Sequence, residues 1–145
     1  FNDLAGAKEA ALSHVEAGAD LLWQSGDGVG IAVMGACEEA DVLCFGNVAN
    51  QTELAPDNVV ANYVYDWSTV YAQMIEETAA GTFGDKYYWI EFANDGVKLI
   101  YNDAVADEVI TDEIRADVDE AIQGFIDGTL DLGDLDAYEL EEAEQ

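Results

Sequence analysis

Apolar and polar positions along the chain repeat with two periods, which separate strands from helices. Short apolar runs are typical of buried strands, and they occur at Asp20–Gln24, Asp41–Phe45 and Val59–Tyr65. Helical content or spacing covers Leu4–Ala17, Ile31–Ala40, Trp67–Ala80 and the stretch from Thr111 to Asp127. A strand, a helix and a second strand in this order form a βαβ unit with parallel strands and a right-handed crossover. The pattern therefore predicts an α/β fold.

Residues suited to helix ends stand at several of these boundaries. Side chains that accept hydrogen bonds from free helical N–H groups precede three segments: Asn2 or Asp3, Asp66, and Thr111 or Asp112. Glycines suited to a left-handed closing residue follow the same segments: Gly18, Gly81 and Gly128. These residues predict where three of the helices begin and end.

The last third of the chain carries a turn signal and an acidic end. Tyr87–Phe92 and Val97–Tyr101 alternate on either side of Asn94-Asp95-Gly96, which predicts an antiparallel hairpin. From Asp131 to Gln145 the chain reads DLGDLDAYELEEAEQ, which is acidic and only weakly apolar. We expect a domain over residues 1–130 and a solvated acidic tail over 131–145.

The charge balance narrows the possible functions. Asp and Glu total 32, Lys and Arg total 4, and the formal net charge is −28 over 145 residues. Nothing in such a chain neutralises phosphates, so we expect no nucleic acid partner and no adhesion to an anionic membrane surface. A surface adapted to high salt, a nucleic-acid mimic and a calcium-loaded protein remain possible. The spread of acids along the chain favours the first, and no EF-hand loop occurs.

Cysteine and histidine are scarce, which limits catalysis and metal binding. Cys37 and Cys44 lie seven positions apart and are either two buried small hydrophobes or a disulfide. His14 is the only histidine, and it lies beside the apolar face of the first predicted helix. No Ser/His/Asp arrangement and no metal-binding spacing can be assembled from these residues. We expect no cofactor and no metal, and a binding function rather than an enzyme.

Two turns follow the first two predicted strands, at the sheet edge where α/β proteins bind ligands. The turn Ser25–Gly30 reads SGDGVG and could bind a nucleotide phosphate, but Ile31 stands where a GxGxxG motif needs glycine. Asp27 would also repel a phosphate. The alternatives are a turn that lets the helix pack on the sheet, or one that hydrogen-bonds a neutral ligand through Gln24 and Ser25. A Rossmann-like enzyme with a nucleotide cofactor stays open as the rival hypothesis.

The second turn, Gly46–Gln51, contains amide side chains and no charge. Amides both donate and accept hydrogen bonds, which suits hydroxyl groups or the edges of bases. Trp67 follows the third predicted strand and could stack on a planar ligand. The residues expected to form the edge of a ligand cleft are Gln24, Ser25, Asp27, Asn47, Asn50 and Trp67.

Several short motifs follow one another in a fixed order along the chain. They are Phe1, Asp3, Lys8, Ala11, Gly18-Ala19-Asp20, Trp67, Tyr71, Gly81-Thr82-Phe83, Gly96-Val97-Lys98-Leu99, Asn102-Asp103-Ala104-Val105 and Asp127-Gly128-Thr129. In this order the chain resembles the second half of the basic-membrane-protein-family lipoproteins. These are substrate-binding proteins of ABC importers, similar to purine-nucleoside receptor lipoproteins. The resemblance covers roughly residues 1–132.

The resemblance implies a type I periplasmic-binding-protein fold, in which two α/β lobes enclose a ligand cleft. This chain would be the Rossmann-like, three-layer C-terminal lobe with its hinge-crossing segments, and the first lobe would precede Phe1. The helix Trp67–Ala80 would pack on that first lobe. The resemblance also implies a small-molecule ligand, an ABC permease as partner, and a place on the extracellular face of the membrane, with a lipid anchor.

The same resemblance bears on the ligand. Nucleoside-binding members of the family hold ribose through an acidic residue after the second strand, where this chain has Val48 and Asn50. A lysine used by some members is replaced by Val64 or Tyr65. A purine nucleoside or base is the first expectation, and another small polar solute is the second. A ligand-sensing regulatory module of the same fold is a further alternative.

Overall fold

A computed structural model describes residues 3–26, 28–84 and 86–130, and the acidic stretch predicted as a tail lies outside them. At its centre is a four-stranded sheet in the order β1-β2-β3-β4. The strands are β1 (Leu21–Trp23), β2 (Leu43–Val48), β3 (Val59–Tyr65) and β4 (Val97–Tyr101). The first three strands are parallel, and β4 runs antiparallel to β3. The predicted βαβ unit is therefore present.

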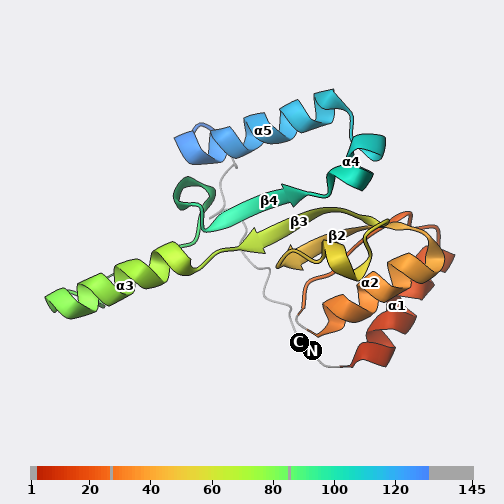
Figure 1. The fold of residues 1–145 in the computed structure, drawn as a ribbon, viewed down its shortest axis with the longest axis horizontal. Coiled ribbons are helices and arrows are strands. Elements are labelled where there is room, and N and C mark those ends of the chain that lie inside the picture. The colour runs from red at the N-terminus through yellow and green to blue at the C-terminus, as the bar shows by residue number, and fades with distance from the viewer. Residues whose placement is uncertain (1–2, 27, 85, 131–145) are drawn as a thin grey trace, which may run out of the picture.

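Helices lie on both faces of the sheet and complete a three-layer α/β lobe (Figure 1). They are α1 (Leu4–Glu16), α2 (Val29–Ala40), α3 (Ser68–Ala80), α4 (Asp103–Val109) and α5 (Asp112–Asp127). Short 3-10 turns, η1 (Thr52–Leu54) and η2 (Phe92–Asn94), lie in the connections before β3 and β4. Helices α1 and α2 cover one face, whereas α4 and α5 lie over the other.

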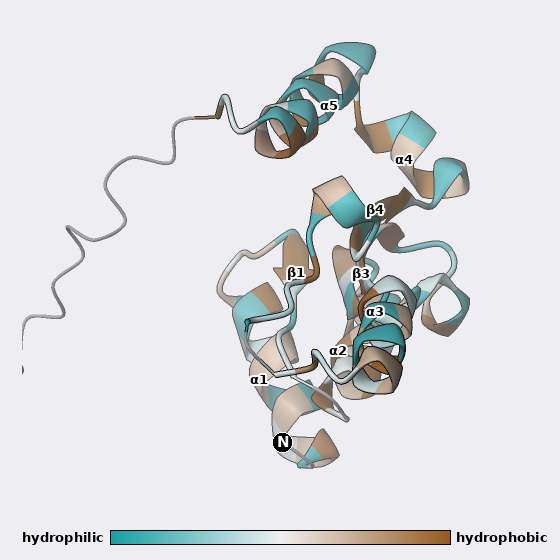
Figure 2. Ribbon diagram, turned by 90° about the vertical axis from the view of Figure 1, so that its left-hand side faces the viewer, coloured by the Kyte–Doolittle hydropathy of each residue, from teal (hydrophilic) through white to brown (hydrophobic). Residues whose placement is uncertain are grey.

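Two apolar clusters hold the layers together. The larger one packs Met34 and Cys37 of α2 against Cys44 and Val59 of the sheet, and all four side chains are fully buried. The smaller one groups Val60, Val105 and Ala106, with Phe45, Tyr101 and other partly buried residues against them. Figure 2 shows β3 and β4 largely in hydrophobic colours, whereas α5 is hydrophilic over much of its surface. Burial is thus deepest on the α2 side.

The predicted helix ends are largely confirmed. Asp3 Oδ1 accepts a hydrogen bond from the N–H of Gly6 at 2.9 Å, and Thr111 Oγ1 accepts one from the N–H of Ile114 at 3.2 Å. These bonds satisfy N–H groups that have no partner within the helix. The three glycines predicted to close helices all have a positive φ: Gly18 after α1, Gly81 after α3 and Gly128 after α5.

The predicted hairpin is wrong. Strand β4 forms but pairs with β3, and the stretch 86–91 forms no strand. The Asn94 side chain explains the difference, because its oxygen accepts the N–H groups of Glu91 (2.9 Å) and Gly96 (3.0 Å). These local bonds occupy donors that a hairpin would have used between strands. The chain therefore folds back as η2, and a short helix that the pattern did not predict, α4, follows β4.

Between β3 and β4 the chain leaves the sheet and carries α3 outward (Figure 1). We call this segment, residues 66–84 and 86–96, the excursion. Its neck is closed by the N–H of Asp66, which donates to the carbonyl of Gly96 at 2.8 Å. The ammonium group of Lys98 contacts Asp66 Oδ2 at 2.8 Å. Asp66 also accepts the N–H of Ser68 at 3.0 Å, close to the capping role predicted for it. The excursion thus has one fixed point on the sheet.

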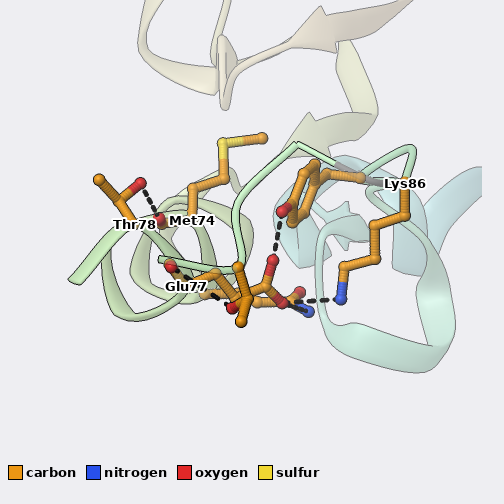
Figure 3. Close-up of polar contacts among 7 residues, drawn as sticks. Met74, Glu77, Thr78 and Lys86 are labelled. Carbon is orange, nitrogen blue, oxygen red and sulfur yellow. Dashed lines mark hydrogen bonds and ion pairs between the residues drawn. The ribbon is translucent and has the colours of Figure 1, made fainter. Parts of the chain in front are cut away.

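The outer part of the excursion is fastened to α3 by Glu77 (Figure 3). Its carboxylate contacts the ammonium group of Lys86 at 2.7 Å and accepts a hydrogen bond from the Tyr88 hydroxyl. The hydrogen bond from Lys86, and then that from Tyr88, hold the pKa of Glu77 below its usual value. The loop after α3 therefore lies back along the helix.

Candidate functional site

The carboxyl ends of the parallel strands are joined by a chain of amide groups. Gln24, just after β1, donates from Nε2 to Gln51 Oε1 at 3.3 Å. The same oxygen accepts the backbone N–H of Asn47 in β2 at 3.1 Å. The N–H of Gln51 in turn donates to Asn62 Oδ1 of β3 at 2.8 Å. The network fixes three neighbouring strands relative to one another.

Glycines make room for these amides. A Cβ atom on Gly46 would lie 2.0 Å from Asn62 Oδ1, and one on Gly30 would lie 2.8 Å from Gln24 Nε2. Cβ atoms essentially never come this close to another heavy atom to which they are not bonded, so the amide groups pack directly on bare backbone. Gly30, the last residue of the turn for which a phosphate site is one hypothesis, therefore serves the packing of α2 and the amide network, which is the alternative for this turn.

A hollow of about 500 Å³ opens at this edge, on the face of the sheet that carries the smaller apolar cluster. Pockets of about 300–1,000 Å³ are usual for small molecules. The residues that line the hollow are Trp23, Ser25, Phe45, Gly46, Asn47, Tyr63, Tyr65 and Leu99. None of them carries a charged side chain, and five are large and apolar or aromatic. The hollow therefore suits a neutral ligand with a flat apolar surface.

Aromatic side chains dominate this lining. Tyr63 and Tyr65 meet edge to face, with ring centroids 5.2 Å apart and an interplanar angle of 82°. Trp23 is 65% exposed, so much of its surface is available for contact. Burial, and then the neighbouring Tyr65, raise the pKa of Tyr63, so its hydroxyl stays protonated at neutral pH. The site thus offers ring faces for stacking and a neutral hydrogen-bond donor.

Two of the predicted site residues line the hollow. Ser25 follows β1, and Asn47 lies inside β2, which runs to Val48 rather than ending at Phe45 as predicted. Gln24 is buried at the same edge, and its Oε1 accepts the N–H of Gly26 at 3.0 Å. Gln24 therefore holds the turn that carries Ser25.

The other predicted residues lie elsewhere. Asn50 Oδ1 accepts the N–H of Thr52 at 3.0 Å on the exposed surface, outside the lining of the hollow. Trp67 precedes α3 and stacks on Tyr71, with centroids 6.0 Å apart. Asp27 lies outside the described residues. The structure thus brings Ser25 and Asn47 together and places Asn50 and Trp67 apart from them.

The apolar part of the lining was not predicted from the sequence. These residues are Trp23, Phe45, Tyr63, Tyr65 and Leu99. A usable signal existed in β3, where two tyrosines alternate with other residues at the carboxyl end of a strand and so face the same side of the sheet.

Metal-binding and membrane-spanning features are not found in the part of the chain that the structure describes. No three His, Cys, Asp or Glu side chains among residues 3–26, 28–84 and 86–130 are placed to hold a metal ion. No helix of those residues is long and apolar enough to cross a bilayer.

Comparison with models of protein families identifies the family of this chain. Residues 1–127 match the family described as "Bmp: ABC transporter substrate-binding protein PnrA-like". The chain belongs to the Bmp family. This finding confirms the resemblance drawn from the short motifs, and the family is one of substrate-binding proteins that act outside the cell or in the periplasm. No functionally curated protein matches the sequence.

Solved structures show the same fold. An ABC transporter system solute-binding protein from Conexibacter woesei DSM 14684 is 30% identical, with a TM-score of 0.68 over 92% of this chain and 43% of its own. A solute-binding protein of the same kind from Aeropyrum pernix K1 has a TM-score of 0.74 at 15% identity, over 88% of this chain and 44% of its own. This Bmp-family chain spans less than half the length of these proteins.

A third similar structure is described as a protein of another kind. It is a transcriptional activator of the comK gene from Bacillus halodurans, with a TM-score of 0.71 at 22% identity, over 87% of this chain and 43% of its own. At this identity the likeness shows the fold alone. The Rossmann-like lobe expected for a Bmp-family chain is thus confirmed.

Proposed function

We propose that this chain is the C-terminal ligand-binding lobe, residues 1–130, of an extracellular receptor that delivers a small solute to an ABC permease. The observation that carries the proposal is the uncharged aromatic hollow at the carboxyl ends of the strands. In α/β proteins this edge is where ligands bind. The lobe binds the solute without chemical change, because the lining of the hollow offers stacking and hydrogen bonding and no pair of acid and base.

The excursion between β3 and β4 supports a second, N-terminal lobe. Two apolar side chains of α3 are poorly covered by this lobe: Tyr71 is 56% exposed and Ile75 is 69% exposed. They belong to an apolar hollow of about 550 Å³ that is lined by Tyr71, Met74, Ile75, Thr78, Ala79 and Phe83. In this proposal the first lobe covers that surface. The two lobes then close over the solute by a hinge motion at the neck.

The lining points to the class of solute. A planar ring can stack on Trp23 or Tyr63, while the Ser25 hydroxyl and the Asn47 amide bind its polar edge. Val48 and Asn50 stand where nucleoside-binding members carry an acid, which removes a partner for ribose hydroxyls. A purine base or nucleoside is the first candidate, and another small polar solute is the second.

The acidic surface supports a receptor exposed to high external salt. Each lysine and arginine is already paired: Lys8 with Glu39, Lys86 with Glu77, Lys98 with Asp66, and Arg115 with Asp107 and Asp103. These four cations leave a formal net charge of −28 on the chain. We propose a salt-loving source organism and a receptor held on the outer face of the membrane by a lipid anchor.

Two alternatives belong to other classes. A ligand-sensing regulatory module is favoured by the Bacillus halodurans protein, which is described as a transcriptional activator and has the same fold. A Rossmann-like enzyme with a nucleotide cofactor is favoured only by the turn Ser25–Gly30. A helix-turn-helix encoded upstream would support the first alternative, and a tightly bound nucleotide in the purified protein would support the second.

Isothermal titration calorimetry tests the proposal. The full two-lobe protein is titrated in concentrated KCl with adenosine, guanosine, inosine, adenine, guanine and hypoxanthine. Saturable one-to-one binding by at least one of them supports a purine receptor. If folded protein releases no heat with any purine, the purine assignment fails, and a screen of other polar solutes decides whether the receptor function survives.

A further inference from the structure

The two cysteines of the chain meet inside the larger apolar cluster. Cys37 lies on α2 and Cys44 lies on β2, and both are fully buried. The Cys44 thiol donates at 3.4 Å to the Sδ atom of Met34, which lies about one helical turn before Cys37. The Cys37 thiol is 3.9 Å from the carbonyl oxygen of Leu43, the residue next to Cys44. Both thiols therefore occupy the same small space between helix and strand.

The backbone explains how residues seven positions apart come into contact. Helix α2 ends at Ala40, and Asp41 takes the left-handed conformation that reverses the chain. The N–H of Val42 then donates to the carbonyl oxygen of Cys37 at 3.1 Å. This turn brings the start of β2 directly beneath the last turn of α2. A disulfide bond would therefore link two residues that this backbone turn already holds close together.

The thiols also differ in acidity. In the folded lobe the neighbouring Cys44 thiol lowers the pKa of Cys37, whereas the neighbouring Cys37 thiol and burial raise the pKa of Cys44. Thiol–disulfide exchange needs one sulfur that attacks as a thiolate. Before the lobe folds, either cysteine can supply that thiolate.

We propose that Cys37 and Cys44 form a disulfide bond, which links α2 to β2 when the protein folds in oxidising surroundings. The oxidant is a disulfide of low molecular weight or of an exchange enzyme. The thiolate of one cysteine, for example Cys37, attacks it, forms a mixed disulfide and releases one thiol. Cys44 then loses its proton and attacks the Cys37 sulfur, which releases the second thiol. Two protein thiols are oxidised, one external disulfide is reduced, and the two protons end on the released thiols.

Burial determines when this bond forms. Because neither thiol reaches solvent in the folded lobe, the oxidant must act before α2 docks on the sheet. The bond is then shielded from reductants after folding. The inference goes beyond solute binding, since it concerns the core on the opposite face of the sheet from the hollow.

Peptide mapping tests the bond. The full-length protein is refolded with oxidised and reduced glutathione, unfolded in guanidinium chloride with an alkylating agent, and cut with a protease that cleaves after glutamate. Glu38 and Glu39 lie between the cysteines, so cleavage separates them unless a bond joins them. The expected product is one linked species, lighter by two hydrogens than its two peptides and carrying no alkyl group.

Two controls keep the result decisive. Protein refolded with a phosphine reductant should give two separate alkylated peptides, and a Cys37→Ser variant should give one alkylated Cys44 peptide. The oxidised protein should also unfold at higher urea concentration than the reduced protein, and a Cys37→Ala/Cys44→Ala variant should show no such difference. Natively folded protein with two alkylated cysteines, glutathione adducts or links between chains after oxidative refolding overturns the proposal.

Discussion

Asn62 shows how single residues set the geometry of the site. Its side chain is fully buried, accepts the N–H of Gln51, and donates from Nδ2 to Thr52 Oγ1 at 3.0 Å. A buried amide left without these partners would destabilise the fold. A side chain at position 46 would displace the Asn62 oxygen, so the network needs glycine there. The positions of the strand ends therefore depend on Gly46, which lines the hollow, and on Asn62, which does not.

Gly46→Ala should lower the free energy of unfolding by about 1–3 kcal/mol, because its methyl group collides with Asn62 Oδ1. Gly35→Ala is the matched control, since a Cβ at that helical position would have no atom within 4 Å apart from its chain neighbours and the nearby backbone of its own helix. The control should be neutral or gain about 0.5–1 kcal/mol. Urea titrations of both variants measure the effect, and equal stabilities would contradict the proposed crowding at Gly46.

Trp23→Ala should weaken solute binding roughly tenfold, since an aromatic contact contributes about 0.5–1.5 kcal/mol beyond its buried area. Trp89→Ala is the control, because the two side chains are 65% and 66% exposed and only Trp23 lines the hollow. Calorimetry of both variants, with urea titrations to show unchanged folding, checks the expectation. A larger loss of affinity in the Trp89 variant would move the site to the excursion.

At the scale of elements, the excursion is fixed at its neck by the ion pair between Asp66 and Lys98. The hydrogen bond from Lys98, and then those from Ser68, hold the pKa of Asp66 well below its usual range. A carboxyl group with a lowered pKa stabilises the folded state fully above its unfolded pKa, about 3.9. This contribution is lost as the pH falls toward the folded value.

Asp66→Asn should therefore destabilise the protein at neutral pH and differ less from the parent as the medium becomes acidic. Asp57→Asn serves as the control, because Asp57 is exposed and takes part in none of the ion pairs within the described residues. Urea midpoints measured between neutral and acidic pH, at constant KCl, give the comparison. A constant difference at every pH would show that the ion pair does not set the effect.

Much of the fold could be predicted because its strands and helices carry clear periods and caps. The hairpin could not be predicted correctly, because the Asn94 side chain accepts hydrogen bonds from Glu91 and Gly96 and so competes with the pairing of two strands. Ser25 and Asn47 could be placed at one edge because both come at or near the ends of parallel strands. The aromatic lining was missed because the period of a strand shows which residues share a face, but not which face stays open.

The apolar side of α3 makes a prediction for the two-lobe protein. Ile75→Glu should lower its stability and weaken ligand binding, since Ile75 lies in the apolar hollow assigned to the first lobe. Thr69→Glu adds the same charge to an exposed position of α3 outside that hollow and should have little effect. Thermal unfolding and calorimetry report both. Identical behaviour of the two variants would contradict coverage of α3 by the first lobe.

At the scale of the whole molecule, charge governs the conditions under which the lobe folds. In a chain with a net charge of −28 the carboxylates repel one another most strongly in dilute buffer, and salt screens that repulsion. The urea midpoint should rise steeply from dilute buffer to molar KCl. A midpoint that is independent of salt would contradict an adaptation to saline surroundings.

Binding of a solute against the uncharged aromatic hollow is the central claim of the proposed function. A crystal structure of the full-length protein with the purine that calorimetry selects would show that binding directly. We expect the purine ring to stack on Trp23 or Tyr63 and its polar edge to bind Ser25 and Asn47, between two closed lobes. A solute bound away from all four side chains would contradict this site, even if the protein proved to be a receptor.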